Sequence, residues 1–442
     1  MEFNINYAEK LITKEKYKEA EKILEQLWSE SNKNDMYLLS RYGQVLRKND
    51  RQIEYIKICR EKIKNKSLLS NKYVVSTLCW CIYDVYISCF SYTDENEFNE
   101  FIKKAEYIIK NSCQEKADRC FINPYVLTVR KVIKVYKNKG TNYRKILKWL
   151  DFLKPESLPE DVFSFTDSNG IEREQASLKE FYYQIRSMAL EKLEMYYECI
   201  ECCNKAFEEI NFFHYKNQIW LKERMLYSRC MFSESVDELN KNIEEYKKFA
   251  LNKNLWYVYH KISKYYYRNN ELDEALYWGA KALTTDYNGD NMNKLILDLA
   301  FIYDNKGDNK IAKIFFQACA YYRNLNNWIL PEELKYKILE SDIDINELPN
   351  IKEMKSICLN YVRQREGKNI KHGMIKKLFI DKGFGFIQSQ ENQDIYFRTN
   401  NLKQKINLRI GLKVKFEVAK DKQGRKVAIK IKEVYRDGRS TY

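Results

Sequence analysis

Hydrophobic residues recur every three or four positions through most of the first 370 residues, a spacing typical of helices that bury one face. Residues 256–283 show it most clearly, as two predicted helices separated by the sequence RNNE. The positions predicted to face neighbouring helices are Ile262, Ser263, Tyr266, Ala275, Gly279 and Ala282. Because several of these side chains are small, the stretch predicts a closely packed helix pair.

The same arrangement returns elsewhere in the chain. In the next pair the equivalent residues are Leu299, Ala300, Tyr303, Ala312, Phe316 and Cys319, with Gly307 in the turn, and Ala275 and Ala312 are 37 residues apart. Near the N-terminus the template fits Tyr7, Ala8, Leu11, Ala20, Leu24 and Leu27, and a looser copy contains Tyr42, Gly43 and Leu46. This pattern resembles the tetratricopeptide repeat, whose helix pairs recur about every 34 residues.

The resemblance implies a solenoid whose concave surface holds a protein or peptide partner. We expect the first helix of the clearest pair to contact that partner through Tyr257, Lys261, Lys264 and Tyr265. Residues 155–175 interrupt the helical pattern with two prolines, a Ser-Asn-Gly turn and several carboxylates. We interpret this segment as an irregular, solvated insertion between helix pairs. The alternative is a loop that binds a metal or a partner.

After residue 370 the pattern changes to strict alternation, which predicts strands. Phe384 and Phe386 lie two residues apart, so a strand places both rings on one face and Gly385 on the other. Residues 394–398 alternate in the same way, and residues 411–434 read as two further strands joined by a glycine-containing turn. Four to five short strands in so few residues predict a small closed barrel.

Two motifs give this barrel a family resemblance. Residues 382–387 read KGFGFI and residues 394–402 read DIYFRTNNL. They resemble the two ribonucleoprotein motifs of the cold-shock domain, a five-stranded OB-fold barrel that binds single-stranded nucleic acid. The chain departs from that family at four positions. Lys377 replaces the usual stacking tryptophan, Leu378 replaces a phenylalanine, and Arg398 and Thr399 replace a histidine and a phenylalanine, respectively.

The resemblance implies a nucleic-acid site of aromatic and basic side chains. The residues expected in it are Lys376, Lys377, Phe379, Lys382, Phe384, Phe386, Tyr396 and Arg398. Stacking contributes about 1–3 kcal/mol per base, so replacing rings by cations predicts weaker base preference and steeper salt dependence. The family favours single-stranded RNA as the ligand, with single-stranded DNA as the alternative. A degenerate barrel that contacts only protein is a further alternative.

Charge and glycine support a boundary near residue 370. The 442 residues carry a net charge of +15, but residues 371–442 hold 18 Lys and Arg against 7 Asp and Glu, whereas the preceding residues hold 59 against 55. The same last stretch holds 6 of the 13 glycines. We therefore predict a multi-domain chain: an all-α solenoid of helix-turn-helix repeats (1–365), a linker (366–370), a β-barrel (371–436) and a tail (437–442).

Candidate chemistry elsewhere in the chain is sparse. Twelve cysteines without a signal peptide or a membrane-length apolar run predict a cytoplasmic protein with reduced thiols and no membrane contact. We expect the clusters Cys79/Cys81 and Cys199/Cys202/Cys203 to fill helix seams rather than bind metal. There are three histidines and no P-loop, serine-hydrolase, zinc-protease or dinucleotide motif. No catalysis, cofactor or metal is therefore expected.

These patterns together predict a non-catalytic adaptor. It would hold a protein partner on the solenoid and single-stranded RNA on the barrel, in bacterial post-transcriptional regulation, stress or phage defence. Two other hypotheses fit the same residues. One is a protein–protein scaffold whose basic barrel docks on an acidic partner. The other is an RNA-processing enzyme with an unrecognised metal site.

Overall fold

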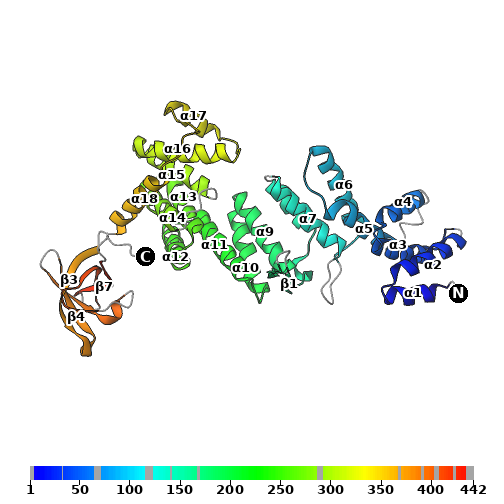
Figure 1. Cartoon of the computed structure of the whole chain (residues 1–442), viewed down its shortest axis with the longest axis horizontal. Coiled ribbons are helices and arrows are strands. Elements are labelled where there is room, and N and C mark those ends of the chain that lie inside the picture. The colour runs from blue at the N-terminus through cyan, green and yellow to red at the C-terminus, as the bar shows by residue number, and fades with distance from the viewer. Residues whose placement is uncertain are drawn as a thin grey trace. The chain divides into compact units, whose positions relative to one another are not determined.

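The computed structural model describes residues 4–31, 33–63, 71–114, 123–139, 142–166, 170–285, 292–366, 370–389, 393–402, 408–421 and 425–434. The chain divides into two compact units, Met1–Tyr246 and Lys247–Tyr442. The first unit is built of helices with one short β-hairpin, and the second contains helices followed by a β-barrel (Figure 1).

Helices adjacent in sequence pack against each other throughout the first unit. They are α1 (Ile5–Thr13), α2 (Tyr17–Glu30), α3 (Met36–Lys48), α4 (Gln52–Ile63), α5 (Lys72–Ile82), α6 (Glu95–Asn111), α7 (Pro124–Asn138), α8 (Tyr143–Leu150), α9 (Leu178–Lys192), α10 (Tyr196–Glu209) and α11 (Tyr215–Phe232). Helix α5 continues directly into a π-helical segment, η2 (Tyr83–Ser88). The next helix, α12 (Val236–Lys253), spans the division between the units.

Short polar residues begin many of these helices. The Asp35 carboxylate accepts hydrogen bonds from the backbone N–H groups of Tyr37 and Leu38, at 2.8 and 3.1 Å. The Asn71 side chain does the same for the start of α5. Such caps satisfy N–H groups that have no partner within the helix. An Asp or Asn between two amphipathic stretches therefore determines the residue at which the second helix begins.

The second unit contains the repeat that the sequence predicts most clearly. Its helices are α13 (Trp256–Arg268), α14 (Leu272–Thr285), α15 (Asn293–Asn305), α16 (Asn309–Leu325), α17 (Glu332–Glu340) and α18 (Ile351–Glu366). Helices α13 and α14 form one antiparallel pair, α15 and α16 form the next, and the pairs pack in chain order. The predicted seam residues Ala275, Ala282, Ala312 and Cys319 are all fully buried or nearly so. The predicted pairing of helices, of the tetratricopeptide-repeat (TPR) type, is therefore confirmed.

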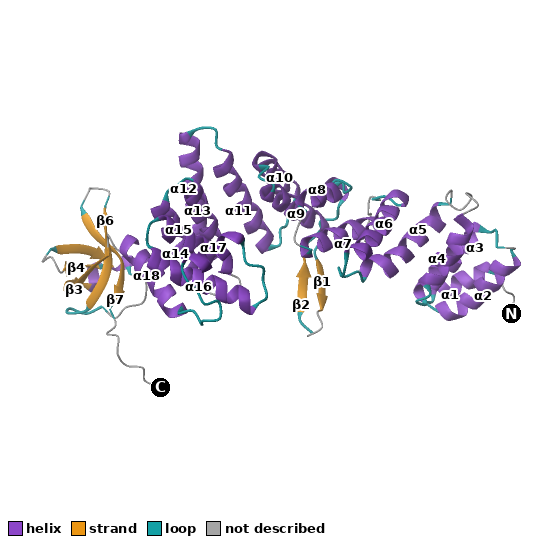
Figure 2. Cartoon of the chain, turned by 90° about the horizontal axis from the view of Figure 1, so that it is seen from above, coloured by secondary structure: helices purple, strands orange, loops and turns teal. Residues whose placement is uncertain are grey.

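The segment that interrupts the helical pattern contains a hairpin that the sequence analysis does not anticipate. Strands β1 (Phe163–Thr166) and β2 (Glu172–Gln175) pair antiparallel, after a short 3-10 turn at Pro155–Ser157. Figure 2 shows the hairpin projecting from the surrounding helices. Each strand is only four residues long, which is too short for a strong alternation signal.

The barrel is closed by five strands in the order β3-β4-β5-β7-β6, and β6 also pairs with β3. They are β3 (Ile370–Phe379), β4 (Phe384–Ser389), β5 (Asp394–Arg398), β6 (Lys413–Lys420) and β7 (Lys426–Glu433). All pairs are antiparallel except β5 with β7. The core is apolar and consists of Ile375, Ile387, Ile395, Phe397, Leu412, Val414, Phe416, Ala428 and Ile431. The predicted small barrel is therefore confirmed.

The described part of the chain contains no helix that is both long and apolar enough to cross a membrane.

We predict that Gly43→Ala destabilises the first unit. A Cβ atom at Gly43 would overlap the ring of Tyr55, which is fully buried. Overpacking of this kind costs about 1–3 kcal/mol, so thermal unfolding followed by circular dichroism should begin several degrees lower, as expected at roughly 2–4 °C per kcal/mol. The control is Lys48→Ala in the same helix, where the side chain is exposed. Equal midpoints for the two variants would contradict the packing argument.

Candidate nucleic-acid interface

A bulge in β3 determines which side chains the barrel directs outward. Ile375 pairs with Ile387 and Lys377 pairs with Phe386, so Lys376 is an extra residue in the register. Without the bulge, alternation would turn Lys377 inward, because Ile375 is in the core. With it, Lys376 and Lys377 are both exposed, and Phe379 follows on the outer face, 42% exposed.

Four aromatic rings meet on this outer face. The Phe384 ring centroid lies 4.9 Å from that of Phe379, 5.6 Å from that of Tyr396 and 6.2 Å from that of Phe386, and Phe386 and Tyr396 are 5.8 Å apart. The two closest pairs are tilted by 30° and 35°, and both pairs that involve Phe386 are T-shaped. Phe384, Phe386 and Tyr396 are half-buried, so each ring still presents surface to solvent. We call these four residues the aromatic cluster.

The backbone beneath the cluster requires glycine. A Cβ atom at Gly385 would lie 2.6 Å from Cε1 of Phe397 and 2.7 Å from the carbonyl oxygen of Lys377. Phe397 is a fully buried core residue and cannot move aside at small cost. Gly385 therefore lets β4 lie directly against the core, which leaves the flanking rings of Phe384 and Phe386 on the opposite side.

Cations lie across the strands from the rings. The register pairs Lys377 with Phe386 and Arg398 with Phe384. Arg398 Nε donates a hydrogen bond to the Tyr396 hydroxyl at 3.3 Å, which holds the guanidinium beside the cluster. Both cations are exposed. Rings that can stack on bases and cations that can meet phosphates thus share one face, as single-strand binding requires.

Lys376 is held differently from the other predicted cations. Its Nζ atom lies 2.9 Å from Oδ2 of Asp394, and both side chains are about two-fifths exposed. Lys382 is exposed in the 3-10 turn η6 (Ile380–Lys382), immediately before β4. Asp394 was missed by the sequence analysis, although alternation with Ile395 places it outward. Its carboxylate neutralises one of the expected phosphate contacts.

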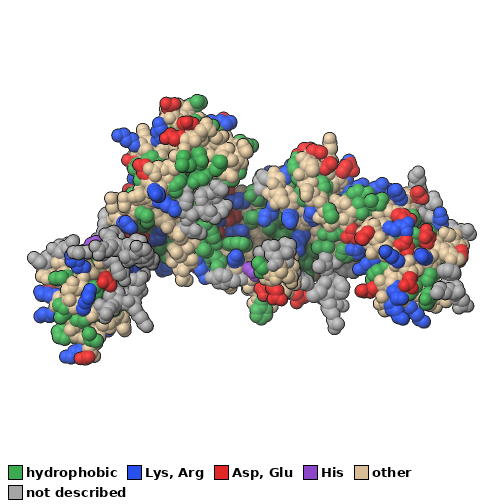
Figure 3. Space-filling model, viewed as in Figure 1, with side chains coloured by type: hydrophobic (Ala, Val, Ile, Leu, Met, Phe, Trp, Pro, Cys, Tyr) green, Lys and Arg blue, Asp and Glu red, His purple; other side chains and the backbone are tan. Residues whose placement is uncertain are grey.

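The predicted residues therefore have distinct positions on the barrel. Those that the strands bring onto one face are Lys377, Phe379, Phe384, Phe386, Tyr396 and Arg398. Of the substituted family positions, Leu378 packs against the barrel core, and Thr399 donates from its backbone N–H to the Gly383 carbonyl at 2.9 Å. Figure 3 shows Lys and Arg side chains distributed over the barrel.

The predicted contact with a partner is wrong for one residue of α13, because that residue is buried. Tyr265 is only 5% exposed, and its ring packs edge-on against Tyr266. Helix α13 packs against both α14 and α15, so it buries a wider arc than a helix with one neighbour. Tyr257, Lys261 and Lys264 keep part of their surface accessible.

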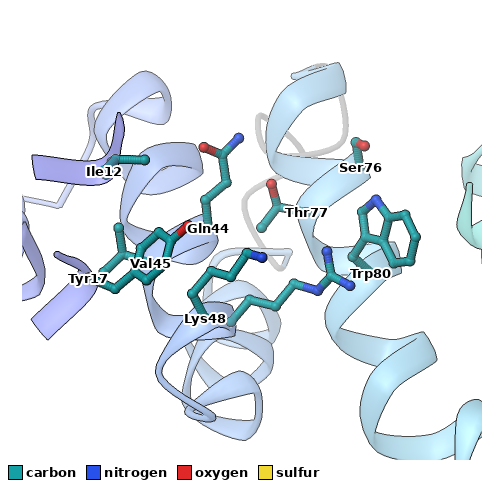
Figure 4. Close-up of a pocket in the computed structure, with 9 residues that line it drawn as sticks. Ile12, Tyr17, Gln44, Val45, Lys48, Ser76, Thr77 and Trp80 are labelled. Atoms are coloured by element: carbon teal, nitrogen blue, oxygen red, sulfur yellow. The ribbon is translucent and has the colours of Figure 1, made fainter. Parts of the chain in front are cut away.

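A pocket in the first unit is lined by both polar and aromatic side chains. It has a volume of about 310 Å³ and is lined by residues of α1, α2, α3 and α5, among them Tyr17, Gln44, Lys48, Thr77 and Trp80 (Figure 4). The Arg47 guanidinium lies 4.1 Å from the Trp80 ring centroid and pairs with Asp84. The pocket thus combines aromatic walls with cationic and amide groups.

The cysteine clusters are buried in helix seams, as predicted. Cys79, Cys81, Cys199 and Cys203 are fully buried, and Cys202 is nearly so. Burial raises the pKa of the Cys79 and Cys81 thiols to about 12, so both remain protonated at neutral pH. In the part of the chain that the structure describes, no group of His, Cys, Asp and Glu is arranged to hold a metal ion.

The alternative interpretation of residues 155–175 makes their carboxylates ligands of a metal. Glu160 pairs with Lys179 at 2.8 Å, and Glu172 and Glu174 lie on β2 with exposed side chains. Asp167 lies outside the described residues. These placements fit a solvated insertion whose acidic side chains face water or a lysine.

Comparison with protein families gives one match. The model of the "'Cold-shock' DNA-binding domain" matches residues 371–434, which is the barrel described above. A comparison with curated protein sequences finds no match.

Among solved structures, three similar ones share low identity with the chain. The C-terminal part of a TPR repeat-containing protein from Cytophaga hutchinsonii is 12% identical over 64% of this chain and 95% of that one, with a TM-score of 0.31. A structure of Naa15/Naa10 bound to HypK-THB is 11% identical over 82% of this chain and 50% of that one (TM-score 0.38). The human IFIT1 dimer with PPP-AAAA is 9% identical over 82% of each chain (TM-score 0.33).

We predict that Phe384→Ala/Phe386→Ala abolishes most single-strand binding. Each ring that stacks on a base is worth about 1–3 kcal/mol, so the double variant should bind an oligonucleotide roughly 30-fold more weakly or worse. Fluorescence anisotropy measures the loss. The matched control is Met374→Ala, an exposed apolar side chain of β3 outside the aromatic cluster. A similar loss in both variants would contradict a role specific to the cluster.

A second prediction concerns the carboxylate beside the cluster. Asp394→Asn should tighten nucleic-acid binding, because it removes a negative charge and releases Lys376 to meet a phosphate. The slope of log affinity against log salt should steepen by about 0.7 if one more phosphate is neutralised. Glu417→Gln is the control, since Glu417 pairs with Lys430 at 2.8 Å on β6 and β7. An unchanged affinity and slope for Asp394→Asn would show that no phosphate reaches Lys376.

Proposed function

We propose that the barrel at residues 371–434, which is a cold-shock domain, binds single-stranded nucleic acid, and RNA in particular. The observation that carries the proposal is the aromatic cluster. Four rings lie with centroids 4.9–6.2 Å from their neighbours on a face shared with Lys377 and Arg398. Rings that stay partly exposed stabilise a barrel less than buried ones, but they offer stacking surfaces to unpaired bases.

The replacement of rings by cations shapes the expected specificity. Stacking and phosphate contacts accept any base. Lys377 and Arg398 therefore contribute affinity that falls with salt, rather than sequence preference. Arg398 is also held close enough to the cluster to stack on a base itself.

The helical part would supply the second half of an adaptor. A protein segment bound to the helices would be brought close to the nucleic acid on the barrel, which raises its local concentration without any chemistry. The pocket of α1, α2, α3 and α5 supports this proposal, because Lys48, Gln44 and Thr77 can hydrogen-bond a peptide between aromatic walls. We further propose that the protein is not an enzyme and that it acts in regulation, stress or defence.

The first test compares ligands for the full chain. Single-stranded RNA, single-stranded DNA and duplex of the same length are titrated at several salt concentrations. We expect single strands to bind more tightly than duplex, with a salt slope near −2 if Lys377, Lys382 and Arg398 each neutralise one phosphate at about 0.7. Labelled RNA should remain intact with Mg²⁺ or Mn²⁺ added.

Three outcomes would contradict the proposal. Equal affinity for duplex would contradict base stacking, because paired bases cannot reach the rings. Cleavage of the RNA that requires a metal would identify an RNA-processing enzyme. Absence of binding at low salt, with a partner still retained on the helices, would identify a protein scaffold.

A further inference from the structure

The helix pair α7 and α8 is strongly basic, although the helical part as a whole is nearly neutral. Residues 123–150 contain eight Lys and Arg and no Asp or Glu. The first 370 residues as a whole are nearly balanced, with 59 basic against 55 acidic residues. Positive charge is therefore concentrated in one helix pair of the first unit.

Four of these cations lie along one side of α7. Arg130, Lys131, Lys134 and Lys137 follow the spacing of a single helix face, which we call the α7 cationic face. The opposite side of the helix is buried and apolar, with Val129, Val132, Ile133 and Tyr136 among its residues. Lys134 and Lys137 are exposed, whereas Arg130 and Lys131 are half-buried, with Arg130 lying over the Phe181 ring. The four cations span about 10 Å of helix at 1.5 Å per residue.

These cations lack the ion pairs that other lysines and arginines of the first unit make. Among the described residues, no carboxylate lies within ion-pair distance of the α7 cationic face, whereas Lys139 pairs with Glu95 and Arg186 with Asp151. Lys131 instead donates a hydrogen bond to the Ser88 carbonyl at 2.6 Å. Four like charges on one face repel each other, so the protein bears a cost there that a bound anion would offset.

Partial burial adds to that cost. It lowers the pKa of Arg130, and it lowers the pKa of Lys131 together with the charge of Lys134. A phosphate placed at this face would favour the charged forms.

Aromatic side chains stand next to the cations. The π-helical segment η2 (Tyr83–Ser88) packs on α7 through the contact of Lys131 with Ser88. Burial and the negative charge of Asp84 raise the pKa of Tyr83, and the charge of Arg130 opposes that shift. The ring of Tyr83 meets that of Trp80 edge-on at 6.1 Å. π-helical turns frequently occur at functional sites.

We propose that the α7 cationic face is a second nucleic-acid contact, which takes the phosphates of an RNA or DNA strand. A nucleic acid presents one phosphate at every nucleotide, so it can meet several cations along about 10 Å of helix, and Tyr83 offers a ring for a neighbouring base. The contact belongs to the helical part and does not require the barrel. It goes beyond the function proposed above, because it makes the helices themselves a binding surface for nucleic acid.

The test uses two matched pairs of lysine substitutions in the full chain. Lys134→Ala/Lys137→Ala removes two exposed cations of the α7 cationic face. Lys18→Ala/Lys22→Ala removes two lysines of α2, a helix that also carries Glu19, Glu21 and Glu25. Each pair is made alone and together with Phe384→Ala/Phe386→Ala. Binding of a long oligouridylate is measured by anisotropy across a salt series, and circular dichroism verifies folding.

We expect the α7 pair to weaken binding several-fold at low salt and to flatten the salt slope by about 1.4, because each phosphate that is no longer neutralised reduces the slope by about 0.7. The α2 pair should leave both unchanged. In the background of Phe384→Ala/Phe386→Ala, residual binding should persist and then disappear when the α7 pair is added. Binding that is abolished by the α7 pair but not by the barrel variant would refute the barrel site and leave this inference standing.

Two results would overturn the inference. One is an equal change in affinity and slope for both lysine pairs, since charge alone would then account for the effect. The other is binding of polyglutamate to the α7 cationic face as tightly as of oligouridylate, which would assign the face to an acidic protein.

Discussion

One extra residue in β3 decides what the barrel offers to a ligand. Because Lys376 occupies a bulge, the strand changes parity between Ile375 in the core and Lys377 outside it. Phe379 is thereby placed against Phe384 instead of in the core. On the neighbouring strand, Gly385 lets the backbone lie against Phe397, so that Phe384 and Phe386 face outward. The aromatic cluster is a consequence of these two backbone features.

The affinity and specificity of this barrel for a nucleic acid depend on how much of the binding free energy comes from stacking on rings and how much from attraction to cations. Rings supply stacking that is largely insensitive to salt, and cations supply attraction that salt weakens. In this barrel, cations stand at positions where the family usually has rings, and Asp394 offsets one of the cations. A contact at the α7 cationic face would add attraction that salt weakens and that does not depend on the rings.

Much of the barrel could be predicted from sequence, because alternation and glycine report directly on which face a side chain occupies. The outward rings of Phe384 and Phe386 followed from period-two spacing alone. The bulge at Lys376 could not be predicted, since a one-residue shift leaves no mark in composition. In the helices, small residues at seams identified the repeat, but Tyr265 was wrongly expected at the surface because periodicity does not reveal how many neighbours a helix has. Strands β1 and β2 were not predicted, because four residues are too few for a clear alternation pattern. The excess of positive charge in α7 and α8 is hidden when charges are counted over the whole helical part.

The proposed function depends on the stacking of unpaired bases on the aromatic cluster. Ultraviolet cross-linking of the full chain to a single-stranded oligouridylate, followed by mass spectrometry of the peptides, tests it most directly. We expect cross-links on peptides that contain Phe384, Phe386 or Tyr396, and their loss when duplex replaces the single strand. Cross-links confined to the helices, with the barrel peptides unmodified, would contradict it.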